Sequence, residues 1–271
     1  MNIVITGAGG VLCSAFARAL AADGHKVALL DLNLDAAEKV AAEIRAAGGD
    51  AIAVEANVLD KESLTAAHET VLNAYGKCEV LVNGAGGNNP KGTTTSEYFD
   101  KADLLDENAR SFFDLDKDGV SFVFNLNFLG TLLTTQAFAL DMLETGGSIV
   151  NISSMNAYMP LTKIPAYSGA KAAVTNFTQW LAVHFANCNI RVNAIAPGFF
   201  ATNQNRTLLF NPDGSLTPRS HKIISQTPMG RFGEPEELLG TLRFLIDNDA
   251  AGFITGVTIP VDGGFSAYSG V

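Results

Sequence analysis

Tyr167 and Lys171 are the two residues of this sequence whose types and spacing most clearly suggest chemistry. They are four residues apart in a stretch predicted to be helical, so their side chains would project from one face, one turn apart. A free tyrosine has a pKa of about 10 and exchanges protons poorly near neutral pH. An adjacent ammonium group stabilises the phenolate and lowers this pKa, so the pair could serve as a general acid and base.

Ser154 could complete this arrangement. It follows a short apolar strand expected at residues 148–152, and a loop with two prolines separates it from the helix of Tyr167. A hydroxyl at the end of a strand can donate a hydrogen bond to a carbonyl oxygen held beside the tyrosine. We also assign Asn156, in the same loop, to substrate contact. Ser168 and Lys171 match the S-x-x-K spacing of serine acyltransferases, but no S-D-N or K-T-G partner motif accompanies them.

A glycine-rich turn at residues 6–10 indicates a nucleotide site. It follows a strand predicted at residues 3–5 and precedes a helix predicted from residue 12. Glycines let backbone N–H groups approach a pyrophosphate, whose charge is favoured at a helix N-terminus. Asp31 ends the next predicted strand, where a carboxylate accepts hydrogen bonds from an adenosine ribose and repels a 2′-phosphate. The sequence therefore predicts NAD(H) in preference to NADP(H).

The rest of the sequence alternates predicted strands with predicted helices. Asp35–Glu38 and Asp60 are expected to cap two helices, a long apolar helix is expected at residues 122–143, and another starts at Glu234. This alternation predicts an α/β fold: a single Rossmann-type, doubly wound domain over residues 1–271, whose parallel sheet of about seven strands is flanked by helices on both faces. We expect an irregular insertion near residues 88–120 and a substrate-covering segment near residues 199–227. The further strands are expected at residues 27–30, 51–54, 80–82, 190–195 and 257–259.

Composition narrows the class of protein. The protein has 271 residues, of which 47% are hydrophobic and 17% charged, which is enough apolar material for a large core. A net charge of −10 argues against a nucleic-acid partner. Three well-separated cysteines and an incomplete calcium-loop pattern at residues 114–125 predict neither a disulfide framework nor a metal site. No secretory signal or membrane span is recognisable, so we expect a cytoplasmic protein.

The motifs fall in the order and places typical of the short-chain dehydrogenase/reductase superfamily, which the whole sequence resembles. Three stretches, at residues 6–20, 124–139 and 193–206, are most similar to the D-mannonate oxidoreductase group of that superfamily, also called fructuronate reductases. The motifs are the glycine-rich turn, Asn83-Gly84-Ala85-Gly86, Asn127 to Gly130, Ser154, Tyr167 to Lys171, and Pro197-Gly198 to Thr202.

This resemblance implies roles for individual residues. Tyr167 would be the catalytic acid/base, Lys171 would lower its pKa and hold the nicotinamide ribose, Ser154 would orient the substrate, and Asn127 would position a water against Lys171. Thr202 would bind the nicotinamide carboxamide. The implied cofactor contacts are Gly7, Gly9, Gly10, Val11, Leu12, Asp31, Asn57, Val58, Asn83, Ala85, Gly86, Tyr167, Lys171, Pro197, Gly198, Phe200 and Thr202, with Asn83, Ala85 and Gly86 along the adenine ribose.

Two positions depart from the superfamily pattern. Val11 and Cys13 replace the second and third glycines of the phosphate turn, which leaves less room beside a pyrophosphate and at the helix contact. Asn57 stands where aspartate is usual, and its amide can still hydrogen-bond adenine. The first departure puts the geometry of the phosphate site in question.

The substrate hypothesis is a hexuronate or aldonate, with D-fructuronate and D-mannonate first. A basic segment after Thr202 could grip its carboxylate, and Arg206 is the leading candidate within it. Two alternatives remain: another polyol or sugar acid such as gluconate, or a catalytically silent dinucleotide-binding module. The resemblance also implies a homotetramer built on the helices near residues 122–143 and 167–185. The basic residues are Arg206, Arg219, His221 and Lys222.

Overall fold

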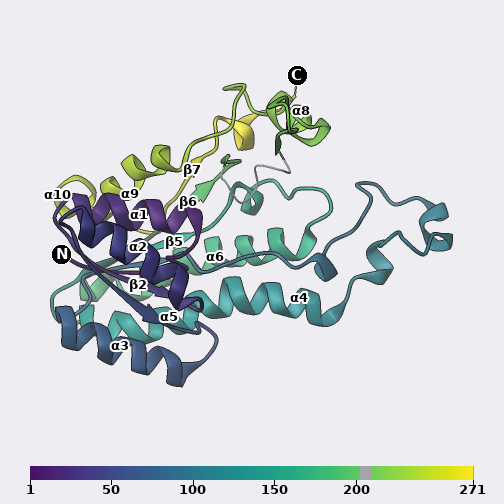
Figure 1. The fold of residues 1–271 in the computed structure, drawn as a ribbon. Coiled ribbons are helices and arrows are strands. Elements are labelled where there is room, and N and C mark those ends of the chain that lie inside the picture. Colours follow the sequence, from purple (N-terminus) through teal and green to yellow (C-terminus); the bar gives the residue numbers. More distant parts are fainter. Residues whose placement is uncertain (202–208, 271) are drawn as a thin grey trace.

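The computed structural model describes residues 1–201 and 209–270, and it is built around one parallel sheet (Figure 1). Seven strands within these ranges pair in the order β3-β2-β1-β4-β5-β6-β7, and every pairing is parallel. The predicted Rossmann-type α/β fold is therefore confirmed. The strands are β1 (Asn2–Thr6), β2 (Lys26–Asp31), β3 (Asp50–Glu55), β4 (Val80–Asn83), β5 (Gly147–Ile152), β6 (Ile190–Pro197) and β7 (Thr258–Val261).

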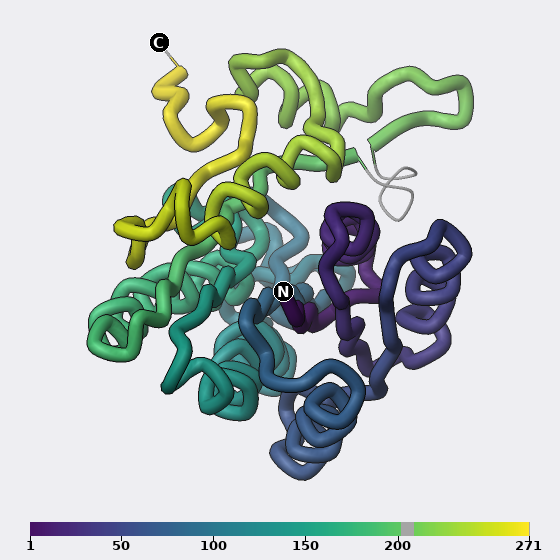
Figure 2. Tube along the Cα trace, turned by 90° about the vertical axis from the view of Figure 1, so that its left-hand side faces the viewer, coloured from purple at the N-terminus to yellow at the C-terminus, as the bar shows by residue number. Residues whose placement is uncertain are grey.

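Helices cover both faces of the sheet, as parallel strands joined by crossovers require. Buried side chains of α1, α2 and α9 pack on one face, and those of α3, α5 and α6 pack on the other. In Figure 2 the C-terminal part of the chain, coloured light green to yellow, lies above the purple N-terminal strand and helix. The helices are α1 (Val11–Ala22), α2 (Leu34–Ala46), α3 (Lys61–Tyr75), α4 (Lys117–Phe124), α5 (Gly130–Phe138), α6 (Pro165–His184), α8 (Pro218–Ser225), α9 (Leu239–Ile246) and α10 (Asn248–Ala251).

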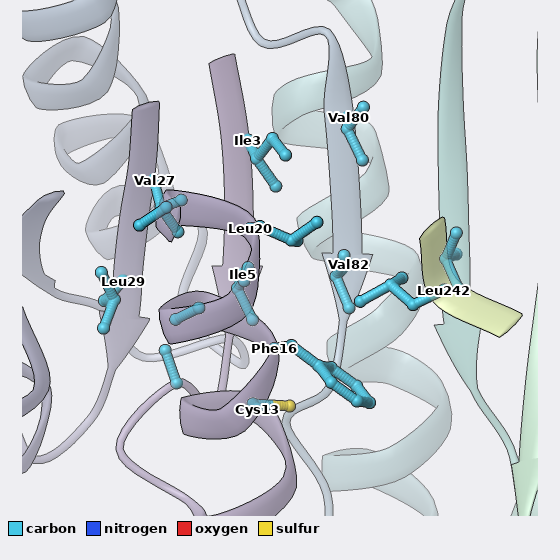
Figure 3. Packing of buried hydrophobic residues seen from close by; sticks show 14 of the residues in the cluster. Ile3, Ile5, Cys13, Phe16, Leu20, Val27, Leu29, Val80, Val82 and Leu242 are labelled. Carbon is cyan, nitrogen blue, oxygen red and sulfur yellow. The ribbon is translucent and has the colours of Figure 1, made fainter. Parts of the chain in front are cut away.

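Successive side chains of a strand point to opposite faces of the sheet, and this divides the core into two layers. Ile3 and Ile5 of β1 face α1, whereas Val4 between them belongs to the opposite layer. Figure 3 shows Phe16 and Leu20 of α1 packed over the first of these faces. Because both faces of each central strand are buried, the strands read as continuous apolar runs rather than alternating ones.

One helix start differs from the prediction. Asn33, not Asp35, caps α2: its side chain accepts a hydrogen bond from the Ala36 N–H. Asp35 instead lies in the first turn, where a negative charge is favoured by the helix dipole. The predicted cap at Asp60 is confirmed, since its side chain accepts hydrogen bonds from the N–H groups of Glu62 and Ser63.

The long apolar helix is also more divided than predicted. It starts at Lys117, after the cap residue Asp116, and a π-helical turn at Asn125–Leu129 separates α4 from α5. By length and composition alone, the stretch Lys117–Met142 could cross a membrane. In the fold its halves pack on neighbouring helices, α4 on α6 and α5 on α3.

Residues 88–116 form an arm that projects from the carboxyl end of the sheet (Figure 1). The arm contains three short 3-10 turns, at Pro90–Gly92, Lys101–Leu105 and Phe112–Asp114. Its acidic residues form local caps: Asp114 accepts hydrogen bonds from Ser111, and Asp116 accepts one from the Gly119 N–H. The acidic residues that resemble the start of a calcium loop therefore belong to a loop that leads into α4.

Candidate active site

A groove of about 580 Å³ opens at the carboxyl ends of β1, β2 and β4. Twelve of the predicted cofactor residues line it: Gly7, Gly9, Gly10, Val11, Leu12, Asp31, Asn57, Val58, Ala85, Gly86, Tyr167 and Lys171. The prediction missed further lining residues, among them Cys13, Ala36, Gly84, Gly87, Leu126 and Ile152. Gly84 and Gly87 were detectable as members of the glycine-rich run after β4, whereas Ala36, Leu126 and Ile152 reach the groove only through the fold.

The turn between β1 and α1 has the features of a phosphate site. Gly10 stands at the N-cap of α1 and no side chain caps the helix, so the first N–H groups keep no partner within the helix. Gly7 has a φ of 65°, and a Cβ on Gly9 would lie 2.8 Å from the Cβ of Ala36. The backbone is therefore held open by glycines where an anion would meet the positive end of the helix dipole.

Cys13 does not narrow this site. Its side chain is 4% exposed and points into the protein, where a Cβ on Gly84 would lie only 2.1 Å from the Cys13 Sγ atom. Figure 3 shows the residue in the layer of Phe16. Gly84 thus supplies the room that the missing glycine at position 13 would have supplied, while Val11 remains at the groove wall.

Asp31 holds the glycine-rich turn in place through hydrogen bonds to backbone N–H groups. Its Oδ2 atom accepts a hydrogen bond of 2.9 Å from the Gly9 N–H, and its Oδ1 atom accepts one of 2.9 Å from the Asn33 N–H. The carboxylate therefore ties the phosphate turn to the start of α2. It is also the charged group at the position where an adenosine ribose would lie.

Asn83 is not among the residues that line the groove, and its predicted cofactor role stays a prediction. Asn83 is 3% exposed, and its Nδ2 group donates hydrogen bonds to Thr135 Oγ1 at 3.0 Å and to Asn151 Oδ1 at 2.9 Å. These bonds join β4 to β5 and α5, away from the groove. Side chains alternate along a strand, so the last residue of β4 faces the helices while the glycines after it face the groove.

Pro197, Gly198 and Phe200, which were also predicted to bind the cofactor, are not among the residues that line the groove. Phe200 is 7% exposed and lines a separate cavity of about 430 Å³. Gly198 donates its N–H to Val261 O, and a Cβ on it would lie 2.6 Å from Asp262. Pro197 ends β6, and Thr202 and Arg206 lie outside the described residues.

The catalytic candidates converge at the start of α6. Pro165 is the first residue of this helix, which places Tyr167 in its first turn and Lys171 one turn later. Lys171 Nζ lies 5.6 Å from the centre of the Tyr167 ring and donates a hydrogen bond of 2.8 Å to Ile152 O. Ser154 is near enough to Tyr167 to lower the pKa of its phenol. A phenol and an ammonium group therefore line the groove, and a hydroxyl group lies near the phenol.

Burial dominates the ionisation of this cluster. It raises the pKa of Tyr167, and the hydrogen bond from Ser154 only partly opposes this. It also lowers the pKa of Lys171 to about 8. We expected the ammonium group to lower the pKa of the phenol; instead, desolvation favours the neutral form of both groups. At neutral pH Tyr167 therefore keeps its proton.

Asn127 lies on the π-helical turn, beside Lys171. Its Nδ2 group donates hydrogen bonds of 2.8 Å to Gly87 O and to Val123 O. A Cβ on Gly86 would lie 2.6 Å from Asn127 Oδ1 and 3.2 Å from Lys171 Nζ. Only a glycine at position 86 lets these two polar side chains approach the backbone from the same side.

The predicted substrate residues are divided by the fold. Asn156 is 4% exposed, its N–H donates to Ser154 Oγ at 3.3 Å, and its Oδ1 atom has no hydrogen-bond partner within the described ranges. A buried amide oxygen of this kind is suited to a ligand hydroxyl. Of the basic residues, Arg219 and His221 are exposed on α8, and Lys222 pairs with Glu97 of the arm.

No group of three or more metal-ligating side chains gathers in residues 1–201 and 209–270. The prediction that the site uses no metal remains a prediction.

Comparison with known proteins agrees with this geometry. A family model described as enoyl-(acyl carrier protein) reductase matches residues 7–266. An uncharacterised oxidoreductase of Haemophilus influenzae is 60% identical over 99% of this chain and 94% of its own length. The uncharacterised oxidoreductase UxuB of Bacillus subtilis is 55% identical over 99% of this chain and 95% of its own length.

A solved structure is similar over the whole length of the protein. It is a crystal structure of a Haemophilus influenzae protein, with bound NAD, that its name proposes to be a D-mannonate oxidoreductase. It is 59% identical, covers 100% of this chain and 96% of its own, and superimposes with a TM-score of 0.96.

Proposed function

The protein belongs to the short-chain dehydrogenase/reductase family of oxidoreductases, and we propose that it transfers a hydride between NAD(H) and a sugar acid, interconverting D-fructuronate and D-mannonate. The observation that carries the chemistry is the cluster of Ser154, Tyr167 and Lys171 at one end of a long glycine-lined groove.

The groove fits a dinucleotide. The uncapped N-terminus of α1 would receive the pyrophosphate, Asp31 the adenosine ribose, and Asn57 with Val58 the adenine. Lys171 lies where it would meet the nicotinamide ribose. Such a cofactor, when bound, supplies or accepts the hydride.

The residues of the protein supply the proton and the orientation. Ser154 holds the carbonyl oxygen beside the Tyr167 hydroxyl, which donates its proton to that oxygen as the carbon is reduced. Burial keeps the phenol protonated at neutral pH, so Tyr167 carries the proton that the reduction needs. Lys171 and Asn127 would return a proton to Tyr167 through a bound water, since both lie next to Gly86.

The choice of NAD(H) over NADP(H) follows from the charge at Asp31. A 2′-phosphate at this edge would meet a carboxylate whose two oxygens already accept backbone hydrogen bonds. Among the groove-lining residues that the structure describes, none near Asp31 is basic. That repulsion is therefore not compensated by a positive charge there.

The substrate proposal is supported by the relatives. The protein with the similar crystal structure is named for D-mannonate, and identity near 60% extends over the complete sequence. Asn156, with its unpaired amide oxygen next to Ser154, adds a polar contact suited to a polyhydroxylated substrate. Another polyol or sugar acid such as gluconate is the second candidate.

We further propose a homotetramer in the cytoplasm. The support is an apolar groove of about 330 Å³ between α5 and α6, on the helices expected to form the subunit contact. All three cysteines are unpaired, which suits a reducing compartment.

The activity is tested by following NADH absorbance with a panel of sugar acids and the corresponding neutral sugars. The proposal predicts turnover with D-fructuronate above all other members. Faster turnover of gluconate-type substrates would favour the second candidate, whereas NADH binding without any turnover would favour a silent binding module.

A further inference from the structure

Three consecutive residues at the end of β5 hold α6 by polar contacts. The carbonyl oxygen of Ile152 accepts the hydrogen bond of 2.8 Å from the Lys171 ammonium group. Its two neighbours, Asn151 and Ser153, both point towards α6, because alternate side chains of a strand lie on the same face of the sheet. Asn151 is 0% exposed and Ser153 is 2% exposed. These hydrogen bonds are therefore shielded from water.

Ser153 holds the backbone of Lys171. Its Oγ atom donates a hydrogen bond of 3.2 Å to Lys171 O, and it lies 2.7 Å from Thr175 Oγ1, one turn further along α6. A serine hydroxyl carries one proton, so the Thr175 hydroxyl is the donor of the second hydrogen bond. The turn of α6 that begins at Lys171 is thus fixed against the end of β5.

Asn151 makes a second contact with the same helix. Its Nδ2 group donates a hydrogen bond of 2.9 Å to Thr178 Oγ1, and the Thr178 hydroxyl donates its only proton to Val174 O at 2.9 Å. The Thr178 oxygen can therefore act towards Asn151 only as an acceptor, which fixes the orientation of the amide. Thr178 is 0% exposed and lies two turns after Lys171.

The other end of the Asn151 amide is fixed in a similar way. Its Oδ1 atom accepts a hydrogen bond of 2.9 Å from the Nδ2 group of Asn83, which pairs with Asn151 in the register of β4 and β5. The same Nδ2 group donates to Thr135 Oγ1 of α5, and the Thr135 hydroxyl donates to Thr131 O. Each threonine gives its proton to a carbonyl oxygen of its own helix, so the two amides between them can take only one orientation.

These polar groups lie in an otherwise apolar layer. Ile149, two residues before Asn151 on the same face of β5, belongs to the cluster that also contains Leu181 of α6 and Phe138 of α5. Apolar contacts are not directional, and they allow a helix to slide or turn at little cost. A buried amide that loses its partner is costly, so the network restricts α6 to the position in which every bond is made.

We propose that Asn151 and Ser153 are positioning residues for Lys171. They fix α6 along β5, and this places the Lys171 ammonium group in the groove. The tolerance is small, because a Cβ on Gly86 would lie only 3.2 Å from Lys171 Nζ, and a slide of α6 by one residue moves the helix by about 1.5 Å. This inference rests on the proposed function, in which Lys171 meets the nicotinamide ribose.

The Thr178 hydroxyl is the group that can be removed with the least change of shape. Thr178→Val leaves the Asn151 amide without its acceptor, whereas Thr178→Ser keeps the hydroxyl. Calorimetry measures the binding of NADH to the full-length protein. Thr178→Val should weaken this binding about fivefold or more, and Thr178→Ser should stay within about twofold of wild type. Unchanged binding in Thr178→Val, or equal losses in the two variants, would overturn the proposal.

A double-mutant cycle with Lys171→Met tests whether the network acts through Lys171. Lys171→Met removes the ammonium group itself and should weaken NADH binding about tenfold. If the network acts by placing that group, Thr178→Val should cause no further loss in the Lys171→Met background. A further loss of the size seen in the wild-type background would overturn the proposal, because the hydroxyl would then support the cofactor site independently of Lys171.

Ser153→Ala tests the other contact, and it replaces Thr178→Val in the cycle if that variant does not fold. It removes the donor to Lys171 O and should weaken NADH binding only while Lys171 is present. Thr134→Val is the matched control: Thr134 is 0% exposed on α5, and its Oγ1 atom has no hydrogen-bond partner in the part of the chain that the structure describes. This control should bind NADH as wild type does, and a loss equal to that of Thr178→Val would contradict the positioning role.

The positioning role and the proposed function fail in different ways. Absence of D-fructuronate turnover by the wild-type protein would overturn the function, and the cycle of NADH binding would still decide the positioning role, because it needs no substrate. Absence of NADH binding by the wild-type protein would overturn both. Normal turnover and NADH binding by the wild type, with NADH binding that Thr178→Val and Ser153→Ala leave unchanged, would overturn only the positioning role.

Discussion

At the scale of single residues, the proposed catalytic cluster contains a buried ammonium group that lowers the stability of the folded protein. Lys171 is 4% exposed and its ammonium group has one hydrogen-bond partner in the described structure, the carbonyl oxygen of Ile152. Burial lowers its pKa from 10.5 to about 8, which means that the folded state holds this proton less tightly than the unfolded state does. A buried charge that opposes folding is typical of a functional site.

The first prediction concerns Lys171→Met. Below about pH 8 the buried ammonium group opposes folding, and this penalty disappears as pH rises from about 8 towards 10.5, because only the unfolded state then still binds the proton. The variant should therefore be more stable than wild type at pH 7, by about 1–2 kcal/mol after the loss of the hydrogen bond to Ile152.

Chemical denaturation at several pH values checks this sign. The stability difference between variant and wild type should shrink above pH 8, and NADH-dependent turnover should be lost at every pH. A difference that is absent at pH 7, or that grows with pH, would show that burial does not control this lysine.

We propose that Asp31 decides between the two cofactors. The second prediction is that Asp31→Asn lets the enzyme use NADPH, because the amide keeps the shape of the side chain but removes its negative charge. The ratio of kcat/KM for NADH to that for NADPH should fall about tenfold or more. Asp35→Asn, in the first turn of α2, is the control. An unchanged ratio in Asp31→Asn would contradict the assigned role.

At the scale of elements, the start of α1 and the exit of β4 are fitted to each other. Cys13 occupies the place of a family glycine, and Gly84 leaves the space that its sulfur fills. The N–H of Gly84 also receives support from Thr6, whose Oγ1 atom accepts its hydrogen bond at 3.1 Å. The position of the phosphate turn relative to Lys171 depends on this contact.

The third prediction follows from that packing. Gly84→Ala would place a Cβ 2.1 Å from Cys13 Sγ and 2.9 Å from Thr6 O, so it should destabilise the protein by about 2–3 kcal/mol. Cys13→Ala in the same background should recover part of this loss, because it removes the nearer clash but not the one with Thr6. A double-mutant cycle of unfolding free energies tests the coupling, and strictly additive effects would disprove it.

At the scale of the whole molecule, one face of the helical layer remains strongly apolar. Leu140 is 66% exposed, Trp180 56% and Leu143 44%, and they line the groove between α5 and α6. Exposed apolar groups of this size are typical of surfaces that bind another protein. The proposed tetramer would cover them.

The fourth prediction is that Trp180→Glu dissociates the assembly, because it introduces a charge into the proposed contact. Light scattering coupled to gel filtration should report a smaller species than for wild type. Lys39→Glu, an exposed substitution on α2 across the sheet, should leave the mass unchanged. A wild-type protein that is monomeric at micromolar concentration would refute the tetramer directly.

The sequence predicted most of the fold because local signals and burial agree in it. Apolar runs indicate each central strand, and glycines indicate the phosphate turn. Tyr167 and Lys171 are four residues apart, so they lie on one face of any helix that contains them. The start of α2 was misjudged because Asn33 and Asp35 are both good caps and lie two residues apart.

Other features of the structure depend on contacts between distant segments. The direction of Asn83 follows from its alignment with Asn151 across the sheet, and the room for Cys13 follows from Gly84. The charge pair of Lys222 and Glu97 arises only when the arm and α8 meet. These contacts join residues that are far apart in the sequence, so no local periodicity predicts them.

The central claim is that Tyr167 is the proton donor of an NADH-dependent reduction, and Tyr167→Phe tests it most directly. The substitution removes only the hydroxyl, so NADH should still bind, as measured by fluorescence titration, while the rate of D-fructuronate reduction falls by about 10³-fold or more. Retained NADH binding with lost turnover is the predicted result. Turnover within a few-fold of wild type would contradict the account.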